Sequence, residues 1–329
     1  MKKLRLVSGM RPTGKLHIGH WQGALVNWVD LQDKYDCFYF VADWHAFTTN
    51  YADMHDLRQD VFEMAADWMA LGVDPKKCTM FIQSRIPEHA ELYLLLSMIT
   101  PLGWLERCPT YKEQLKELRN RDISTLGFLG YPVLQTSDIA LYRASYVPVG
   151  EDQLPHLELA REIVRRFHHL YHTDLFVEPE GLLTKTPKIL GIDGRKMSKS
   201  YNNSIYISDT EEETEKKVKM MITDPARIRA TDPGHPEICS VFDMQNIFNK
   251  EQVECIKKDC IAGKIGCVAC KKNLANILNE QLKEVREKRG KIIRNKDFII
   301  DIFEQGCKKA KEISKSTLQE VREAMKIVF

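Results

Sequence analysis

The sequence lacks any long run of uncharged residues. The longest stretch without Asp, Glu, Lys or Arg covers residues 123–137, and Pro132 interrupts it. A membrane-spanning helix needs about 20 apolar residues, so none is expected. The amino-terminal residues also lack the apolar core of a secretory signal peptide. These absences predict a cytoplasmic protein with no membrane association.

An excess of charge of one sign is also lacking. The chain has 329 residues, with 48 basic and 46 acidic side chains and a net charge of +2. The hydrophobic share of 43% is typical of a globular protein, and the length suggests two domains at about 150 residues per domain. Residues 250–296 do carry 13 basic against 6 acidic residues. This local excess indicates either a solvated helix face or a surface for a phosphate backbone.

Short apolar runs alternate with helical patterns in the first half of the chain. Residues 4–8, 37–42, 80–83 and 146–149 have the composition of buried strands, and between them apolar residues recur at helical spacing from Leu57 to Gly72. The alternation predicts an α/β fold with a doubly wound parallel sheet that binds ligands at the carboxyl ends of its strands. From about residue 209 the pattern is mainly helical, and residues 191–203 indicate a flexible junction.

Two short motifs carry the chemistry. Residues 17–20 read His-Ile-Gly-His after the first strand, and residues 196–200 read Lys-Met-Ser-Lys-Ser in the junction. Both suit the activation of a carboxylate by ATP, because the substrate supplies the nucleophile and the protein must align the reactants and stabilise charge on pyrophosphate. His17, His20 and Gly19 would meet the nucleotide, and Lys196 and Lys199 would close over its phosphates. A capped helix with a core histidine is the alternative reading of the two histidines.

The two motifs resemble the signatures of class I aminoacyl-tRNA synthetases. Residues 8–14, 43–46, 131–139, 147–153 and 188–191 further resemble bacterial tryptophanyl-tRNA synthetases, and the likeness runs essentially from end to end. It implies a homodimer that uses L-tryptophan, ATP with Mg²⁺, and tRNA(Trp). It also implies a Rossmann-type catalytic domain (1–192), a mobile lysine-signature loop (193–204), a helical anticodon-binding domain (205–312) and a C-terminal helix returning to the catalytic domain (313–329).

The resemblance also assigns site residues by position. The ATP site would comprise Arg11, Pro12, Thr13, Gly19, His20, Gly150, Glu151, Asp152, Ile189, Lys196, Met197, Ser198, Lys199 and Ser200. The catalytic residues among these would be Thr13, His20, Lys196 and Lys199, together with His17. The tryptophan pocket would comprise His45, Tyr131, Gln135, Gln153 and Asp138.

The role expected of Asp138 is to accept the indole N–H, since one carboxylate in an apolar pocket suits a single donor on an apolar body. A carboxylate interacting with a helix dipole is the alternative reading. Arg11, His20 and Gln135 depart from many bacterial relatives. Gln135 is reminiscent of tyrosyl enzymes, so tyrosine remains an alternative substrate. A more remote alternative function is that of a small-molecule adenylate-forming ligase that uses no RNA.

Nine cysteines are present, and disulfides are not expected in the cytoplasm. Four of them, Cys239, Cys260, Cys267 and Cys270, could supply thiolates for a [4Fe–4S] cluster or for Zn²⁺, with no metal as a third possibility. Some tryptophanyl enzymes carry a similar set that binds an iron–sulfur cluster. Cys255 would be a bystander. The lysines near this set, Lys257, Lys258, Lys264, Lys271 and Lys272, would form a surface for the anticodon arm of the tRNA.

Overall fold

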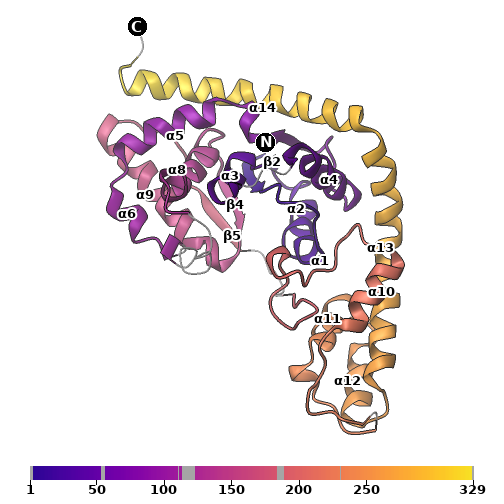
Figure 1. Cartoon of the computed structure of the whole chain (residues 1–329). Helices are drawn as coiled ribbons and strands as arrows, with labels where there is room; N and C mark the ends of the chain where they lie inside the picture. The colour runs from indigo at the N-terminus through magenta and orange to yellow at the C-terminus, as the bar shows by residue number, and fades with distance from the viewer. Residues whose placement is uncertain are drawn as a thin grey trace.

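The structure is a computed structural model that describes residues 3–52, 56–109, 111–112, 123–183, 189–229 and 231–327. Lys188 of the predicted 188–191 segment, and the last two residues of the predicted C-terminal helix, lie outside the described residues. Figure 1 shows an α/β body from which a helical arm extends. No helix in the described ranges is long and apolar enough to cross a membrane.

Five parallel strands form the sheet, in the order β3-β2-β1-β4-β5. Their bounds are β1 Arg5–Met10, β2 Asp36–Val41, β3 Cys78–Ile82, β4 Tyr146–Val149 and β5 Glu180–Leu183. The first four match the strands predicted from apolar runs. The fifth was not predicted because it lies at the sheet edge, where its four residues are only partly buried or exposed and form no apolar run.

Helices cover both faces of the sheet, because successive side chains of a buried strand point to opposite sides. Tyr39 stacks on Trp28 at a ring-centroid distance of 4.2 Å on one face, and Phe38 stacks on Tyr142 at 5.1 Å on the other. The first face is covered by α2 (Val26–Leu31) and α4 (Leu57–Ala70), and the second by α5 (Glu88–Ile99), α8 (Leu126–Ala140) and α9 (Leu154–Tyr171). The predicted doubly wound parallel sheet is therefore confirmed.

Shorter elements connect these helices to the strands. They are α1 (Ile18–His20), a π-helical turn (Trp21–Leu25), α3 (Asp43–Asn50) and α6 (Leu102–Glu106). Single 3₁₀ turns cover Gln83–Arg85, Glu151–Gln153, Lys199–Tyr201 and Pro236–Ile238. The predicted helix that starts at Leu57 is confirmed as α4, and it stops where Gly72 adopts a φ of +109°.

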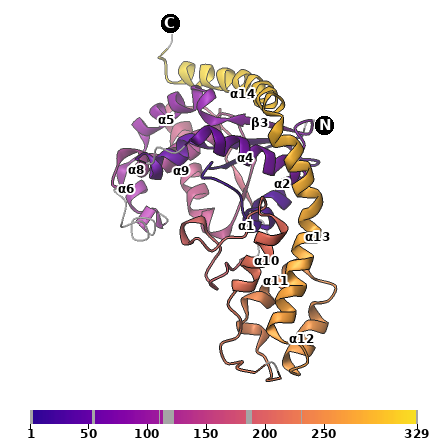
Figure 2. The ribbon, with the colours of Figure 1, turned by 45° about the vertical axis from the view of Figure 1, so that its right-hand side comes forward.

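The described elements after residue 210 are all helical. They comprise α10 (Glu211–Met220), α11 (Ser240–Phe248), α12 (Val253–Ile261), α13 (Cys267–Arg294) and α14 (Lys296–Ala324). Figure 2 shows α13 running from the tip of the arm, beside α11 and α12, back toward the α/β body. One apolar cluster continues from the α2/α4 face of the sheet into these helices, so the arm and the body share buried side chains.

The last helix, α14, lies beside the edge strand β3 and covers it (Figure 2), which protects an exposed sheet edge. Arg322 of α14 makes a two-pronged ion pair with Glu91 of α5 at 2.7 Å, and Glu320 pairs with Arg143 at 2.7 Å. The boundary expected between residues 312 and 313 falls inside this unbroken helix, because its amphipathic pattern begins earlier than the sequence analysis placed it.

The contact between α14 and β3 depends on Gly306, which is buried. A Cβ atom at this position would overlap the carbonyl oxygen of Met80 in β3. We predict that Gly306→Ala lowers the free energy of unfolding by about 1–3 kcal/mol, measured by chemical denaturation. The matched control is Gly290→Ala inside α13, where the nearest atom, Arg294 Nη2, lies 3.8 Å away. The control should be neutral or stabilising by up to about 1 kcal/mol; an equal loss in both variants would contradict the close packing.

Candidate active site

Two cavities meet at the carboxyl ends of β1 and β4. The larger has a volume of about 340 Å³, and the smaller has about 280 Å³. Ser8, Gly9 and Pro148 line both cavities. A Cβ atom on Gly9 would collide with the ring of Phe40, so glycine is required where the two spaces adjoin. This is the edge at which the parallel sheet was expected to bind ligands.

The larger cavity brings together all five residues predicted for the amino-acid pocket. His45 reaches it from α3, three residues reach it from α8, and Gln153 reaches it from the turn before α9. The residues from α8 are Tyr131, Gln135 and Asp138. Arg11, predicted for the ATP site, lines this larger cavity instead. Its role stays a prediction, but its place is beside the amino-acid pocket.

Two of the residues predicted to bind ATP line the smaller cavity. Gly150 and Asp152 line it, together with Asn27 and Trp28. Ile189 and Met197 are buried in the apolar core and line neither cavity. The remaining predicted residues line neither cavity: Pro12, Thr13, Gly19, His20, Glu151, Lys196, Ser198, Lys199 and Ser200.

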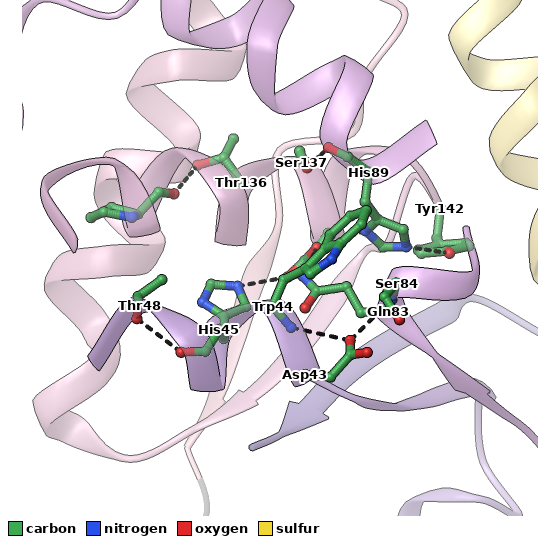
Figure 3. Close-up of polar contacts among 12 residues, drawn as sticks. Asp43, Trp44, His45, Thr48, Gln83, Ser84, His89, Thr136, Ser137 and Tyr142 are labelled. Carbon is green, nitrogen blue, oxygen red and sulfur yellow. Dashed lines mark hydrogen bonds and ion pairs between the residues drawn. The ribbon is translucent and has the colours of Figure 1, made fainter. Parts of the chain in front are cut away.

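Asp138 is the centre of a buried hydrogen-bond network. Its carboxylate accepts hydrogen bonds from Gln83 Nε2 at 2.8 and 2.9 Å, from His45 Nε2 at 2.9 Å and from His89 Nδ1 at 2.6 Å. Figure 3 shows the side chains of His45, Gln83 and His89 converging from three different elements. Burial alone would raise the pKa of Asp138, but the bonds from both histidines outweigh it and hold the pKa below the usual value. Asp138 is therefore an ionised acceptor.

Two partners of Asp138 were missed by the sequence analysis. Gln83 directly follows β3, so its position at the carboxyl end of a strand was a signal that could have found it. His89 is fully buried in α5, and its Nε2 lies 2.7 Å from the hydroxyl of Tyr142. Nothing in the local sequence indicates that partnership, since His89 and Asp138 are far apart in the chain.

A second network includes His156, which was also missed. His156 lines the larger cavity and is 3% exposed. Its Nε2 pairs with the hydroxyl of Tyr131, and its Nδ1 lies 3.1 Å from Gln153 Oε1. Burial lowers the pKa of His156 to about 4, so the ring is neutral at physiological pH. A histidine in the first turn of α9, three residues after its N-cap Gln153, was the available signal.

The two histidines of the first motif hold each other in place at the start of α1. His17 Nδ1 accepts the backbone N–H of Gly19 at 3.1 Å, and His20 Nδ1 accepts that of His17 at 3.2 Å. Burial lowers the pKa of His17 to about 4 and that of His20 well below its usual value, with the charge of Lys199 contributing to both shifts. Both rings are neutral and accept through Nδ1, so each carries its hydrogen on Nε2. The two histidines do cap α1, as the alternative reading of the motif expected. Their capping bonds use Nδ1, so the Nε2–H groups are not consumed by them.

The lysine motif is folded against the loop before α1. Lys199 Nζ donates to the carbonyl oxygens of Gly14 at 2.8 Å and Thr13 at 3.1 Å. Burial lowers its pKa to about 8, although the carboxylates of Asp60 and Asp67 oppose the shift. Backbone bonds between residues 189–191 and 195–197 order the segment, whereas Lys196 itself is exposed.

A buried ion pair connects the helical arm to this region. Arg289 of α13 donates through Nε to Asp67 Oδ1 at 2.6 Å and also pairs with Glu63. The other oxygen of Asp67 accepts the backbone N–H of Leu16, next to the first motif, at 3.3 Å. Burial raises the pKa of Asp67 to about 6 despite the opposing charge of Arg289. The arm thus supports the residues that begin α1.

The four predicted metal ligands lie in one neighbourhood at the tip of the arm. Burial raises the pKa of the Cys270 thiol to about 11, and the thiols of Cys239, Cys260 and Cys267 add to the rise. Arg227 Nη1 lies 3.8 Å from Cys260 Sγ and 3.9 Å from Cys267 Sγ. Among the described residues, no three His, Cys, Asp or Glu side chains form a group that could hold a metal ion.

The lysines predicted to face RNA lie around these thiols. Lys257, Lys258, Lys264 and Lys272 are exposed, whereas Lys271 is partly buried and donates to the carbonyl of Lys219 at 2.9 Å. Cys255 is exposed, and its Sγ lies 3.8 Å from Asp259 Oδ2.

Known proteins are similar to this chain in sequence and in fold. The family described as class I tRNA synthetases (W and Y) matches residues 1–283. The tryptophan–tRNA ligase of Aquifex aeolicus is 46% identical over 98% of this chain and 100% of its own length. That of Thermotoga maritima is 49% identical over 99% of this chain and 100% of its own. A crystal structure of tryptophanyl-tRNA synthetase from Campylobacter jejuni with ADP and tryptophan is 34% identical, with a TM-score of 0.88 over 98% of this chain and 99% of that one.

Proposed function

Because the chain belongs to the class I tRNA synthetases for tryptophan and tyrosine, we propose that it is a tryptophan–tRNA ligase whose two adjoining cavities hold tryptophan and ATP. It activates L-tryptophan to tryptophanyl-adenylate with release of pyrophosphate, and it then transfers tryptophan to tRNA(Trp). The curated relatives named above are both tryptophan ligases, so tyrosine is not favoured as the substrate. A cytoplasmic location forms part of the proposal.

The observation that carries this function is the ionised Asp138 in a cavity with apolar walls. Val7, Phe40 and Phe128 supply apolar surface for an indole ring, and the carboxylate supplies an acceptor for its single N–H. Of the three donors that already bind Asp138, only His45 lines the cavity. The indole N–H therefore approaches Asp138 on the side of His45, beside its ring or in its place.

The smaller cavity suits the nucleotide. Gly9 and Gly150 allow a close approach to the backbone, and the cavity adjoins the amino-acid pocket, so the substrate carboxylate can face the α-phosphate. The neutral His17 and His20 would offer Nε2–H donors to the phosphates. Lys199 would exchange the carbonyls of Thr13 and Gly14 for phosphate oxygens as charge moves onto pyrophosphate, and Mg²⁺ would enter bound to ATP.

We also propose a homodimer, supported by an exposed apolar surface on the α/β body. Leu94 and Met98 of α5, Leu102 of α6 and Leu126 of α8 are all exposed, Leu126 by 77%. Their helices pack against one another, so these side chains lie on neighbouring elements. A surface of this kind on a globular protein suits burial against a second copy of the chain.

The arm would bind the anticodon arm of tRNA(Trp) through its exposed lysines, next to a [4Fe–4S] cluster on the four clustered cysteines. The guanidinium of Arg227 beside two thiols suits sulfur atoms that carry negative charge. Four cysteines could hold a four-iron cluster or, as the alternative, a single zinc ion with all four sulfurs at about 2.3 Å. When bound, such a cluster would serve the fold of the tip.

Replacing Asp138 tests the proposed substrate. Asp138→Asn keeps the size of the side chain but removes the charge, and its amide would face the donors that now bind the carboxylate. We predict that kcat/KM for tryptophan in ATP–pyrophosphate exchange falls about 10- to 100-fold, while KM for ATP changes less than about twofold. A wild-type enzyme that prefers tyrosine, or a variant with unchanged kcat/KM for tryptophan, would refute the assignment.

The shifted pKa of Lys199 predicts a pH dependence. The ammonium is charged below its pKa of about 8 and neutral above it. If the charge binds phosphate, kcat/KM for ATP should fall as the pH rises through about 8, because this ratio reports the free enzyme. Lys199→Arg keeps the charge to much higher pH and should abolish the alkaline decline. The same decline in the variant would show that another group titrates.

The cysteine assignment is tested by metal analysis of anaerobically purified protein. Wild type should be brown and contain iron and sulfide in similar amounts. Cys267→Ser should lose the iron and charge tRNA more slowly, with pyrophosphate exchange unchanged, because the cavities lie in the α/β body. Cys255→Ser is the matched control and should retain both properties. If the protein is colourless and contains stoichiometric zinc, the four cysteines bind zinc and not a cluster. If it contains no metal and Cys267→Ser charges tRNA as fast as wild type, both assignments are rejected.

A further inference from the structure

The side-chain amide of Asn203 ties together the segment that carries the lysine motif (residues 193–203). Asn203 is 1% exposed. Its Oδ1 accepts the backbone N–H of Ser198 at 2.8 Å, and its Nδ2 donates to Asp193 Oδ1 at 2.7 Å and to the carbonyl of Lys196 at 3.2 Å. One buried amide therefore connects the beginning, the middle and the end of the segment.

The direction of these three bonds is fixed by the chemistry of the partners. A backbone N–H can only donate a hydrogen bond, whereas a carboxylate and a backbone carbonyl can only accept one. The amide must consequently turn its oxygen toward Ser198 and its nitrogen toward Asp193 and Lys196. An aspartate at position 203 has nearly the same shape but could keep only the bond to Ser198. The position therefore requires a donor and an acceptor, and not merely a side chain of this size.

The chain enters and leaves this segment at the same place. The backbone N–H of Ile192 donates to the carbonyl of Asn203 at 3.0 Å. A Cβ atom on Gly191 would overlap the side-chain amide of Asn203, so this close approach requires glycine. The two ends of the segment are thus held against each other by packing as well as by hydrogen bonds.

The bonds to Asn203 fix the backbone that leads to Lys199. Met197 is buried, and the residues on either side of it, Lys196 and Ser198, are the two whose backbone groups bind the amide. Lys199 follows directly, and its Nζ donates to backbone carbonyls before α1. The approach of Lys199 to the first motif therefore depends on a side chain that comes later in the sequence.

We propose that Asn203 is a positioning residue that holds the segment 193–203 in the conformation from which Lys199 meets the phosphates of ATP. The inference rests on the proposed function, because it takes ATP as the occupant of the smaller cavity. Asn203 lines neither cavity, so it acts through Lys199 and is not itself a catalytic residue. A segment that is ordered before the ligand arrives loses little conformational freedom on binding. The use of ATP should depend on this amide, and the binding of tryptophan should not.

Limited proteolysis tests the role of the amide without any assay of the reaction. Trypsin cleaves after lysine and arginine, and the segment contains Arg195, Lys196 and Lys199. In Asn203→Ala, cleavage within the segment should be about tenfold or more faster than in wild type, because an opened form becomes more populated. An unchanged rate of cleavage there would overturn the proposal.

The matched control is Asn279→Ala in α13. Asn279 is also a buried asparagine, and its side chain donates to the carbonyl of Glu211 at 3.2 Å and accepts from Arg286 Nη1 at 3.0 Å. Its replacement removes similar hydrogen bonds away from the lysine motif. Cleavage within the segment 193–203 should stay within about twofold of the wild-type rate, since opening there is local. Equal acceleration in both variants would show a general loss of stability and would contradict the assignment.

The kinetic test asks whether Asn203 acts through Lys199. Asn203→Ala should lower kcat/KM for ATP in pyrophosphate exchange about tenfold or more, while KM for tryptophan changes less than about twofold. When Lys199 is already alanine, the same substitution should cost less than about a further twofold, because residues that act as a unit are not additive. A full additional loss in that background would place the effect of Asn203 elsewhere and overturn the proposal.

A pair of substitutions tests the direction of the bonds. Asn203→Asp turns an oxygen toward Asp193 and toward the carbonyl of Lys196, so its kcat/KM for ATP should be no higher than that of Asn203→Ala. Adding Asp193→Asn restores a donor between the two side chains and should recover part of the loss. An Asn203→Asp variant as active as wild type would refute the proposed role. A wild type that shows no exchange with tryptophan would instead reject the proposed function and leave the proteolysis result standing.

Discussion

A buried carboxylate, Asp138, imposes the constraint on which the amino-acid pocket depends. An ionised group inside a protein is costly unless it is fully hydrogen-bonded, and Asp138 meets this condition only when α3, α5, α8 and the turn after β3 all come together. The apolar core brings these elements close, and the network then fixes their mutual positions. The same bonds keep the carboxylate ionised, so the arrangement that stabilises the fold also creates the acceptor that the proposed substrate requires.

The nucleotide side follows a similar logic. Hydrogen bonds to backbone groups hold the side chains of Lys199, His17 and His20 in place, and burial keeps both histidines neutral. Groups ordered in this way lose little conformational freedom when a ligand arrives, which is the advantage of a preorganised site. The ion pair between Arg289 and Asp67 extends the order to the helical arm, because Asp67 also holds the backbone N–H of Leu16. Through this pair, the arm and the first motif support each other.

Much of this architecture could be predicted from the sequence, since local patterns carry the information. Apolar runs located four of the five strands, helical spacing located α4, and the alternation of strands and helices predicted the edge of the sheet that bears the cavities. The resemblance to a known family named the residues of the amino-acid pocket, and the structure brings those five together. Their roles, like the division into domains, stay predictions.

The features that escaped prediction depend on contacts between distant segments. His89 and Asp138 belong to different helices, and Arg289 meets Asp67 from the far end of the chain, so no local pattern records either pairing. Strand β5 lacks an apolar run because it lies at the edge. Helix α14 begins at Lys296, well before the expected boundary between residues 312 and 313, because its amphipathic stripe starts with Ile299 and Phe303.

The most direct measurement is a crystal structure of this chain with L-tryptophan bound. We predict an indole nitrogen at a hydrogen-bond distance of about 3 Å from a carboxylate oxygen of Asp138. A ligand whose indole nitrogen makes no contact with Asp138 while the carboxylate keeps its three present donors would contradict it.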